Sequence, residues 1–294
     1  MNLEAAIEDA KPLRGGSTAS TMHRRTTLQN SAQRYALLAT RVIAGLVFWQ
    51  HGLEKLVGFA GARPEPTLWG IRGVAAILEA LGGPLLVLGL AVRPVAFILS
   101  GEMAVAYFRA WAPRGFFPIA NGGEEATLNT FLFLWLAAAG AGALGVDGWL
   151  EKRYRWSPWQ QLARYEPYVR ALLQFIVGFL LVLHGVRTLF GVLPSVAGRR
   201  NAVTLAIDAL PHVAGYVEVV GGVLLGLGVL VRPASAILCL EAIIAYVFIA
   251  MPRGRWPTRN GGNEALLYVA VLLFLAVAEP VRGVLAAVTR SRRR

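Results

Sequence analysis

The chain has 294 residues, of which 56% are hydrophobic and only 16% are charged, whereas an ordinary soluble domain carries about a quarter charged residues. This deficit of charge argues against a soluble domain and for a protein solvated by lipid. The formal net charge is +12, but the basic residues stand mostly at the edges of apolar segments, so we expect no nucleic acid as a partner. A single cysteine, Cys239, excludes a dithiol relay and a cysteine-rich metal or iron–sulfur site within this chain.

The N-terminal segment, residues 1–33, is polar and lacks the apolar core of a signal peptide. It contains the sequence Gly15-Gly16-Ser17-Thr18, which disfavours a regular element. We therefore predict a mostly disordered tail that becomes helical only near the first membrane span.

Eight apolar segments follow, each close to the roughly 20 residues that a helix needs to cross a bilayer. They cover residues 35–57, 70–91, 94–112, 124–145, 168–190, 212–231, 233–251 and 264–286. Short turns at Val92-Arg93-Pro94 and Val231-Arg232-Pro233 divide two stretches that are too long for one span. Proline is tolerated there because the start of a helix needs no N–H donor. The segments predict an all-α integral membrane protein with about eight spans.

The segments form two tandem copies of one four-helix unit. The stretch EALGGPLLVLGLAVRP at 79–94 returns as EVVGGVLLGLGVLVRP at 218–233, and NGGEEATL at 121–128 returns as NGGNEALL at 260–267, both at an offset of 139 residues. The first span repeats at an offset of 133, where His51-Gly52 matches His184-Gly185. Because each unit has an even number of spans, the two transmembrane bundles point the same way. We predict parallel repeats about an axis along the membrane normal.

The repeat also divides the chain into domains. It predicts a polar tail at 1–33, a first four-helix unit at 34–150, a basic linker at 151–167, a second unit at 168–288 and a basic tail at 289–294. Lysine and arginine are more abundant in the tails and the linker than in the loops of the opposite side, although the second unit has basic loops there. The positive-inside rule therefore places both termini in the cytoplasm of a protein embedded in a bacterial-type inner membrane.

Ionisable residues inside the predicted spans are candidate functional groups, because burying them in a bilayer is costly. At a rise of about 1.5 Å per residue, one layer between the bilayer centre and the outer face collects side chains from four helices. Its members are His51, Glu54, Glu79, Glu102, Tyr107 and Glu125. The layer predicts a polar pocket in the first unit, although the sequence does not say which side chains face each other.

Structural interpretations of two motifs remain open beside the functional ones. His51 and Glu54, with Lys55 next to them, could form a solvated helix end with a local ion pair. Asn121 could cap the fourth helix while Glu124 completes a capping box, or the free N–H groups there could hold an anionic ligand.

The remaining polar and glycine positions are interpreted in the same way. Glu102 is either protonated, paired with Arg109, or used for proton transfer. The glycines Gly82, Gly83 and Gly89 are expected to allow close helix packing and not to take part in chemistry.

The two copies differ at a few polar positions. Arg187 and Thr188 stand where the first copy has Glu54 and Lys55, Asn263 replaces Glu124, and Phe248 replaces Arg109. We expect the first unit to keep the working site if only one unit does.

Several motifs together resemble the DoxX family of small membrane proteins. They are His51-Gly52-x-x-Lys55-Leu56, Glu79 with Gly82-Gly83, Arg93-Pro94, and Asn121-Gly122-Gly123-Glu124. The resemblance covers residues 35–150 and, more loosely, 168–285; a typical member has a single four-helix unit, so the tandem is a departure. It implies a four-helix bundle and an association with membrane redox chemistry. Members are named after a subunit of a thiosulfate:quinone oxidoreductase or terminal quinol oxidase, and others are described as partners in membrane oxidoreductase complexes.

The resemblance and the polar layer lead to a first functional hypothesis, a quinone-linked oxidoreductase or a membrane subunit of an oxidoreductase complex. His51, Glu79 and Glu102 are the expected catalytic proton-handling groups. The residues expected to bind the quinone are His51, Glu54, Lys55, Asn121 and Glu125. The sequence has no flavin, nicotinamide, iron–sulfur or metal signature, so electrons would come from other protein subunits or from a small substrate. Whether the chain itself is an enzyme stays open.

Three other hypotheses remain. The protein could be a non-catalytic membrane subunit or scaffold that binds lipid, quinone or protein in a larger assembly. It could be a small-solute transporter, which parallel repeats permit. A bis-histidine haem between His51 and His184 has the symmetry of the repeat.

Overall fold

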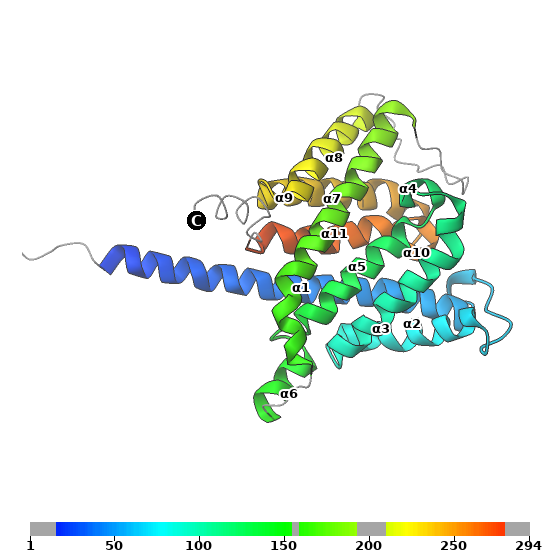
Figure 1. The fold of residues 1–294 in the computed structure, drawn as a ribbon, viewed down its shortest axis with the longest axis horizontal. Helices are drawn as coiled ribbons and strands as arrows, with labels where there is room; N and C mark the ends of the chain where they lie inside the picture. Colours follow the sequence, from blue (N-terminus) through cyan, green and yellow to red (C-terminus); the bar gives the residue numbers. More distant parts are fainter. Residues whose placement is uncertain (1–15, 155–158, 193–209, 280–294) are drawn as a thin grey trace, which may run out of the picture.

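The computed structural model describes residues 16–154, 159–192 and 210–279, and every regular element in these ranges is helical. This confirms the predicted all-α fold (Figure 1). The first unit consists of α1 (Gly16–Val57), α2 (Ile71–Leu88), α3 (Val92–Ala106) and α5 (Glu124–Ala139). The second unit consists of α7 (Glu166–Phe190), α8 (Leu210–Leu227), α9 (Val231–Ala245) and α11 (Asn263–Val277).

Five helical segments of the described chain are long and apolar enough to cross a membrane. They are Ser31–Val57, Ile71–Leu88, Val92–Arg114, Gln161–Phe190 and Val231–Arg253. The other three positions of the repeat hold α5 with 16 residues, α11 with 15, and α8, whose shorter apolar part is His212–Leu227. Large apolar side chains on the outer faces of the helices, such as Leu81, Phe97 and Leu240, are more than half exposed. Such a surface is suited to lipid and not to water.

The tandem repeat extends to the small elements between the long helices. In the first unit, α3 continues into a π-helical turn (Tyr107–Trp111), a 3₁₀ turn (Ala112–Arg114) and the short helix α4 (Pro118–Asn121). In the second unit, α9 continues into Tyr246–Ala250, Met251–Arg253 and α10 (Pro257–Asn260), with the same turn types. Each of these elements recurs at the offset of 139 residues that the sequence predicts.

The two units share one pattern of helix contacts. In the first unit α1 packs on α2, α2 on α3, and α3 on α5, while α7, α8, α9 and α11 repeat this order. The units meet where α1 packs on α11 and where α5 packs on α7, and α5 also contacts α11 (Figure 1). The contacts therefore run in a closed circuit through all eight helices. Side chains on α1, α5, α7 and α11 face both units.

The glycines of α1 and α2 allow these helices to approach closely, as predicted. A Cβ added to Gly83 would lie 2.6 Å from the Cβ of Trp49, and one added to Gly52 would lie 2.3 Å from the backbone nitrogen of Ala80. Real side chains do not tolerate such distances, so only glycine fits. Gly89 ends α2 in the left-handed conformation with φ of 71°, and the guanidinium of Arg41 packs against it.

Several predicted boundaries need correction. The helix α1 begins at Gly16, so the described part of the predicted disordered tail, 16–33, is helical, while residues 1–15 lie outside the described chain. The predicted fourth span, 124–145, ends at Ala139, because Gly140 takes a φ of 79°. The predicted linker is partly helical, with α6 (Val146–Tyr154) and a 3₁₀ turn (Gln160–Tyr165) in it. The C-terminal tail, 289–294, lies outside the described residues.

An arginine bonds to the last carbonyl groups of the shortened helix α5. Arg93 Nη1 donates to the carbonyl oxygen of Ala137 at 3.1 Å and also to that of Ala138. The carboxylate of Asp147 accepts the N–H groups of Ala91 (2.7 Å) and Val92 (2.8 Å) at the start of α3. The α2–α3 turn is therefore bonded to the end of α5 and to the segment after it.

Candidate functional site

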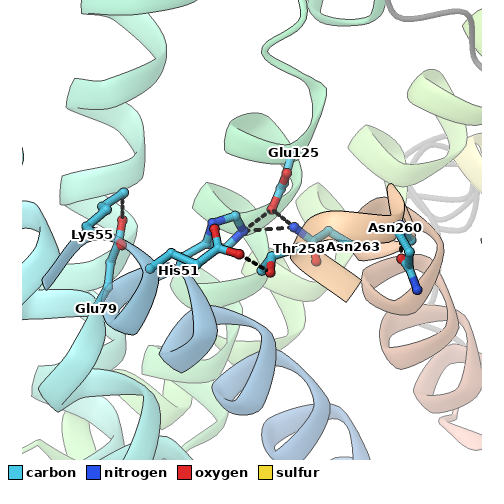
Figure 2. Close-up of polar contacts among 9 residues, drawn as sticks. His51, Lys55, Glu79, Glu125, Thr258, Asn260 and Asn263 are labelled. Atoms are coloured by element: carbon cyan, nitrogen blue, oxygen red, sulfur yellow. Dashed lines mark hydrogen bonds and ion pairs between the residues drawn. The ribbon is translucent and has the colours of Figure 1, made fainter. Parts of the chain in front are cut away.

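His51, near the end of α1, lies at the boundary between the two units. Its Nε2 is 2.8 Å from Glu125 Oε1 on α5 and 2.9 Å from Asn263 Nδ2 on α11 (Figure 2). Asn263 Nδ2 also donates to Glu125 Oε1 at 3.2 Å. The predicted site residues His51 and Glu125 are therefore brought together, and the third member of the cluster comes from the second unit.

Lys55 lies one turn further along α1 and pairs with a buried carboxylate. Its Nζ donates to Glu79 Oε1 on α2 (Figure 2). The side chain of Glu79 is only 2% exposed, whereas that of Lys55 is 32% exposed. The second oxygen, Oε2 of Glu79, has no hydrogen-bond partner in the described chain. The lysine therefore supplies a positive charge directly to this buried carboxylate.

Glu102 on α3 lies near this pair but is not bonded to it. It is close enough to Glu79, Lys55 and His51 to interact with them electrostatically. Its Oε2 is buried without a hydrogen-bond partner among the described residues. Arg109, the suggested alternative partner, is exposed in the π-helical turn. The three residues predicted to be catalytic thus share one region, without a direct hydrogen bond between them.

The other two predicted ligand-binding residues have structural contacts. Glu54 Oε1 accepts a hydrogen bond from Thr258 Oγ1 on α10. Asn121 is fully buried; its Nδ2 donates to the carbonyl of Gly115 at 2.8 Å, and its Oδ1 accepts the N–H of Gly123 at 2.8 Å. Asn260 makes the same two bonds in the second unit.

The predicted capping box at the start of α5 is wrong. Gly123 is the N-cap residue, and no side chain caps the helix there. Asn121 instead closes the loop before the helix, and its Nδ2 is also 3.3 Å from the hydroxyl of Tyr107. The carboxylate of Glu124 turns away from the helix start.

Glu124 instead bonds to the second histidine. Its Oε1 lies 2.7 Å from His184 Nε2 on α7 and accepts a hydrogen bond of 2.6 Å from the hydroxyl of Tyr268 on α11. Glu124 is only 3% exposed. Two neighbouring residues, Glu124 and Glu125, therefore bind the histidines of different units. Each histidine site is completed by a side chain of the other unit.

A cavity of about 510 Å³ lies next to these two histidine sites. Most of its wall belongs to the second unit, with His184, Glu218, Glu241 and Glu264 as its acid/base groups. The apolar part of the wall comes mainly from α9, and it includes Leu238, Ala242, Ile244 and Ala245. Residues of α10 also line the cavity, and α10 lies at the end of the bundle opposite the start of α1 (Figure 1).

The cavity reaches only part of the predicted site. His51 and Glu125 line it, whereas Glu54, Lys55, Glu79, Glu102 and Asn121 do not. Glu218 and Glu241, which line it, are the repeat counterparts of Glu79 and Glu102. This cavity thus lies mostly in the unit that we did not expect to hold the site. The exact offset of the repeat identifies Glu218 and Glu241 as these counterparts from the sequence alone.

Tyr268 and Asn263 are site residues that the sequence analysis did not select. Asn263 was noticed only as a substitution for Glu124. Tyr268 corresponds to Asn129 in the first unit, and both side-chain polar atoms of Asn129 are buried without a partner in the described chain. A comparison of the two copies at buried polar positions would have marked both residues.

The polar groups of the described residues are not arranged as ligands of a metal or a haem. No group of three or more metal-ligating side chains occurs within the described ranges. The Nε2 atoms of His51 and His184 are both bonded to carboxylates, so neither is free in this structure to bind an iron axially. The arrangement is suited to holding and moving protons.

Comparisons with known proteins agree with the motifs. The DoxX family model matches residues 36–111 and 170–251, which together exceed half of the chain. An uncharacterized protein of Haemophilus influenzae is 44% identical over 123 residues, and the match covers 38% of this chain and 89% of that protein. No solved structure matches the chain significantly. The chain belongs to the DoxX family, and it carries the DoxX unit twice.

Proposed function

We propose that the protein is a quinone-linked oxidoreductase, or the membrane subunit of one, and that the quinone head group binds in the second-unit cavity. The observation that carries the proposal is the composition of the cavity wall. Apolar side chains of α9 form one part of it, and the acid/base groups His184, Glu218 and Glu241 form another. A flat, mostly apolar molecule that exchanges protons needs both kinds of surface.

The size of the cavity supports the proposal. Its volume of about 510 Å³ lies within the range of roughly 300–1,000 Å³ that small-molecule sites occupy. The carboxylates of Glu218 and Glu241 line it, and no hydrogen bond or ion pair joins either of them to another residue of the described chain. Their free oxygens are available to a bound molecule.

The chain's own contribution is proton handling. When bound, a quinone supplies reversible two-electron, two-proton chemistry. His184 Nε2 shares a proton with Glu124 Oε1, and the hydroxyl of Tyr268 holds that carboxylate in place. Glu218 and Glu241 can take up or release protons at the cavity wall. The electrons would come from another protein subunit or from a small substrate.

The experiment is to measure the quinone that copurifies with the full chain in lipid nanodiscs, by extraction and mass spectrometry. Ala245→Trp fills the cavity, because Ala245 lines it. Ala106→Trp is the matched control at the equivalent position of the first unit. We expect quinone with the wild type and with Ala106→Trp, and at least a tenfold loss with Ala245→Trp. Equal quinone in all three proteins, or none in the wild type, would contradict the proposal.

A further inference from the structure

The two units differ in the charge that faces the carboxylate on their second helix. In the first unit, the ammonium group of Lys55 binds Glu79. In the second unit, Glu218 takes the place of Glu79, and the uncharged Thr188 takes the place of Lys55. The first unit therefore supplies a tethered cation at a position where the second unit supplies none.

Three carboxylates of the second unit line its cavity. Glu218 and Glu241 line it and interact with each other electrostatically, and Glu264 lines it too. The nearby His184 is already bonded to Glu124. A buried carboxylate is costly unless it is paired or protonated, so the charged form of Glu218 or Glu241 favours the arrival of a cation.

The arginines near the cavity do not replace Lys55. Arg253 lines it at an exposed position, but its counterpart Arg114 is present in the first unit as well. Arg259 is exposed, and its Nη2 donates to the carbonyl of Gly61 at 2.9 Å. Arg253 therefore does not distinguish the units, and Arg259, which stands where the first unit has Ala120, is held at the surface by the carbonyl of Gly61. Because no three metal-ligating side chains gather in the described chain, a divalent metal is also not indicated.

We propose that the second-unit cavity binds a small monovalent cation at Glu218 and Glu241, in the role that the Lys55 ammonium group has at Glu79. Two independent observations carry this inference. One is the cavity, on whose wall Glu218 and Glu241 have no hydrogen bond or ion pair with another described residue. The other is the first unit, where a covalently attached ammonium group binds the equivalent carboxylate. The free cation is an ammonium or an alkali ion. This inference goes beyond the quinone proposal because binding of the cation requires no quinone.

The test is thermal unfolding of the full chain in quinone-free nanodiscs, followed by tryptophan fluorescence at constant ionic strength. Chloride salts of ammonium, methylammonium, sodium and potassium are compared with the bulky N-methyl-D-glucamine salt. A ligand that binds only the folded state raises Tm with its concentration. We expect a saturable rise of about 2–4 °C with at least one small cation. The salts that act identify the type of cation. If no small cation differs from N-methyl-D-glucamine, the inference is wrong.

Variants make the test specific. Thr188→Lys installs the tethered ammonium group of the first unit, so it should raise Tm in N-methyl-D-glucamine and remove the response to small cations. Glu218→Gln should also remove the response. Glu79→Gln in the first unit is the control: it should lower Tm but keep the response. A full response in Thr188→Lys overturns the inference, even if Glu218→Gln cannot be purified. Because this experiment contains no quinone, the absence of a cation response would contradict the cation inference without contradicting the quinone proposal.

Discussion

Glu124 and Glu125 are adjacent in the sequence, yet Glu124 binds His184 of the second unit and Glu125 binds His51 of the first. The first turn of α5 thus connects the two histidine sites. The duplication explains this arrangement, because α5 packs on α7 as α11 packs on α1. Each unit alone would lack part of its own site.

The two carboxylates should contribute unequally to stability. Glu124 is bonded to His184 and Tyr268 and is 3% exposed, whereas the side chain of Glu125 is 21% exposed. Glu124→Ala leaves two buried polar groups without a partner, so we expect it to lower the free energy of unfolding by about 3 kcal/mol. Glu125→Ala should cost about 1–2 kcal/mol. Denaturation in matched detergent would compare them, and an equal or greater loss for Glu125→Ala would contradict the geometry.

The Lys55–Glu79 pair should show strong coupling. Lys55→Met leaves the buried Glu79 without its cation, and we expect a cost near the lower end of about 3–5 kcal/mol, because Lys55 is partly exposed. The double variant Lys55→Met/Glu79→Met should recover most of that loss, since no charge is left unpaired. A double-mutant cycle measured by unfolding checks this. Additive losses would show that the two side chains do not interact.

Close packing of α1 on α2 gives a third prediction. Gly83→Ala places a Cβ 2.6 Å from that of Trp49, whereas a Cβ on Gly101 of α3 has no heavy atom within 4 Å. Overpacking typically costs about 1–3 kcal/mol, so Gly83→Ala should lower Tm and the matched Gly101→Ala should not. Thermal unfolding of the two variants side by side is sufficient. A stable Gly83→Ala protein would mean that α1 and α2 are further apart.

Orientation in the membrane remains a prediction from loop charge. In a Cys239→Ser background, a cysteine at Ala62 should react with an impermeant maleimide added to intact cells. A cysteine at Ala163, in the exposed turn after α6, should react only after the membrane is opened. The reverse pattern would place the termini outside.

The repeat allowed much of the fold to be predicted. Because the offset of 139 residues continues without a gap, α3 and α9 begin at equivalent residues, and so do the turns that follow them. The end of α5 could not be predicted, since the apolar composition continues past Gly140 and only its positive φ stops the helix.

The sequence predicted how deep the site residues lie in the membrane, but not which side chains bond to each other. The position of a residue along a helix axis follows from the number of residues to the helix end, so the sequence places His51, Glu79 and Glu102 in one region. The bond between His184 and Glu124 depends on how α5 packs on α7, which no local pattern encodes. The substitutions of Lys55 by Thr188 and of Glu124 by Asn263 were visible. Their effect depends on the cavity beside the second histidine, which no sequence pattern encodes.

Photoaffinity labelling with an azidoquinone tests the quinone proposal most directly. The full chain in nanodiscs is irradiated with the probe, with and without excess unlabelled quinone, and the labelled residues are mapped by mass spectrometry. The cavity predicts competable labelling within 238–250 of α9 and the π-helical turn after it, where Leu238, Ile244 and Ile249 line the wall. Labelling confined to the first unit, or labelling that excess quinone does not reduce, would contradict the proposal.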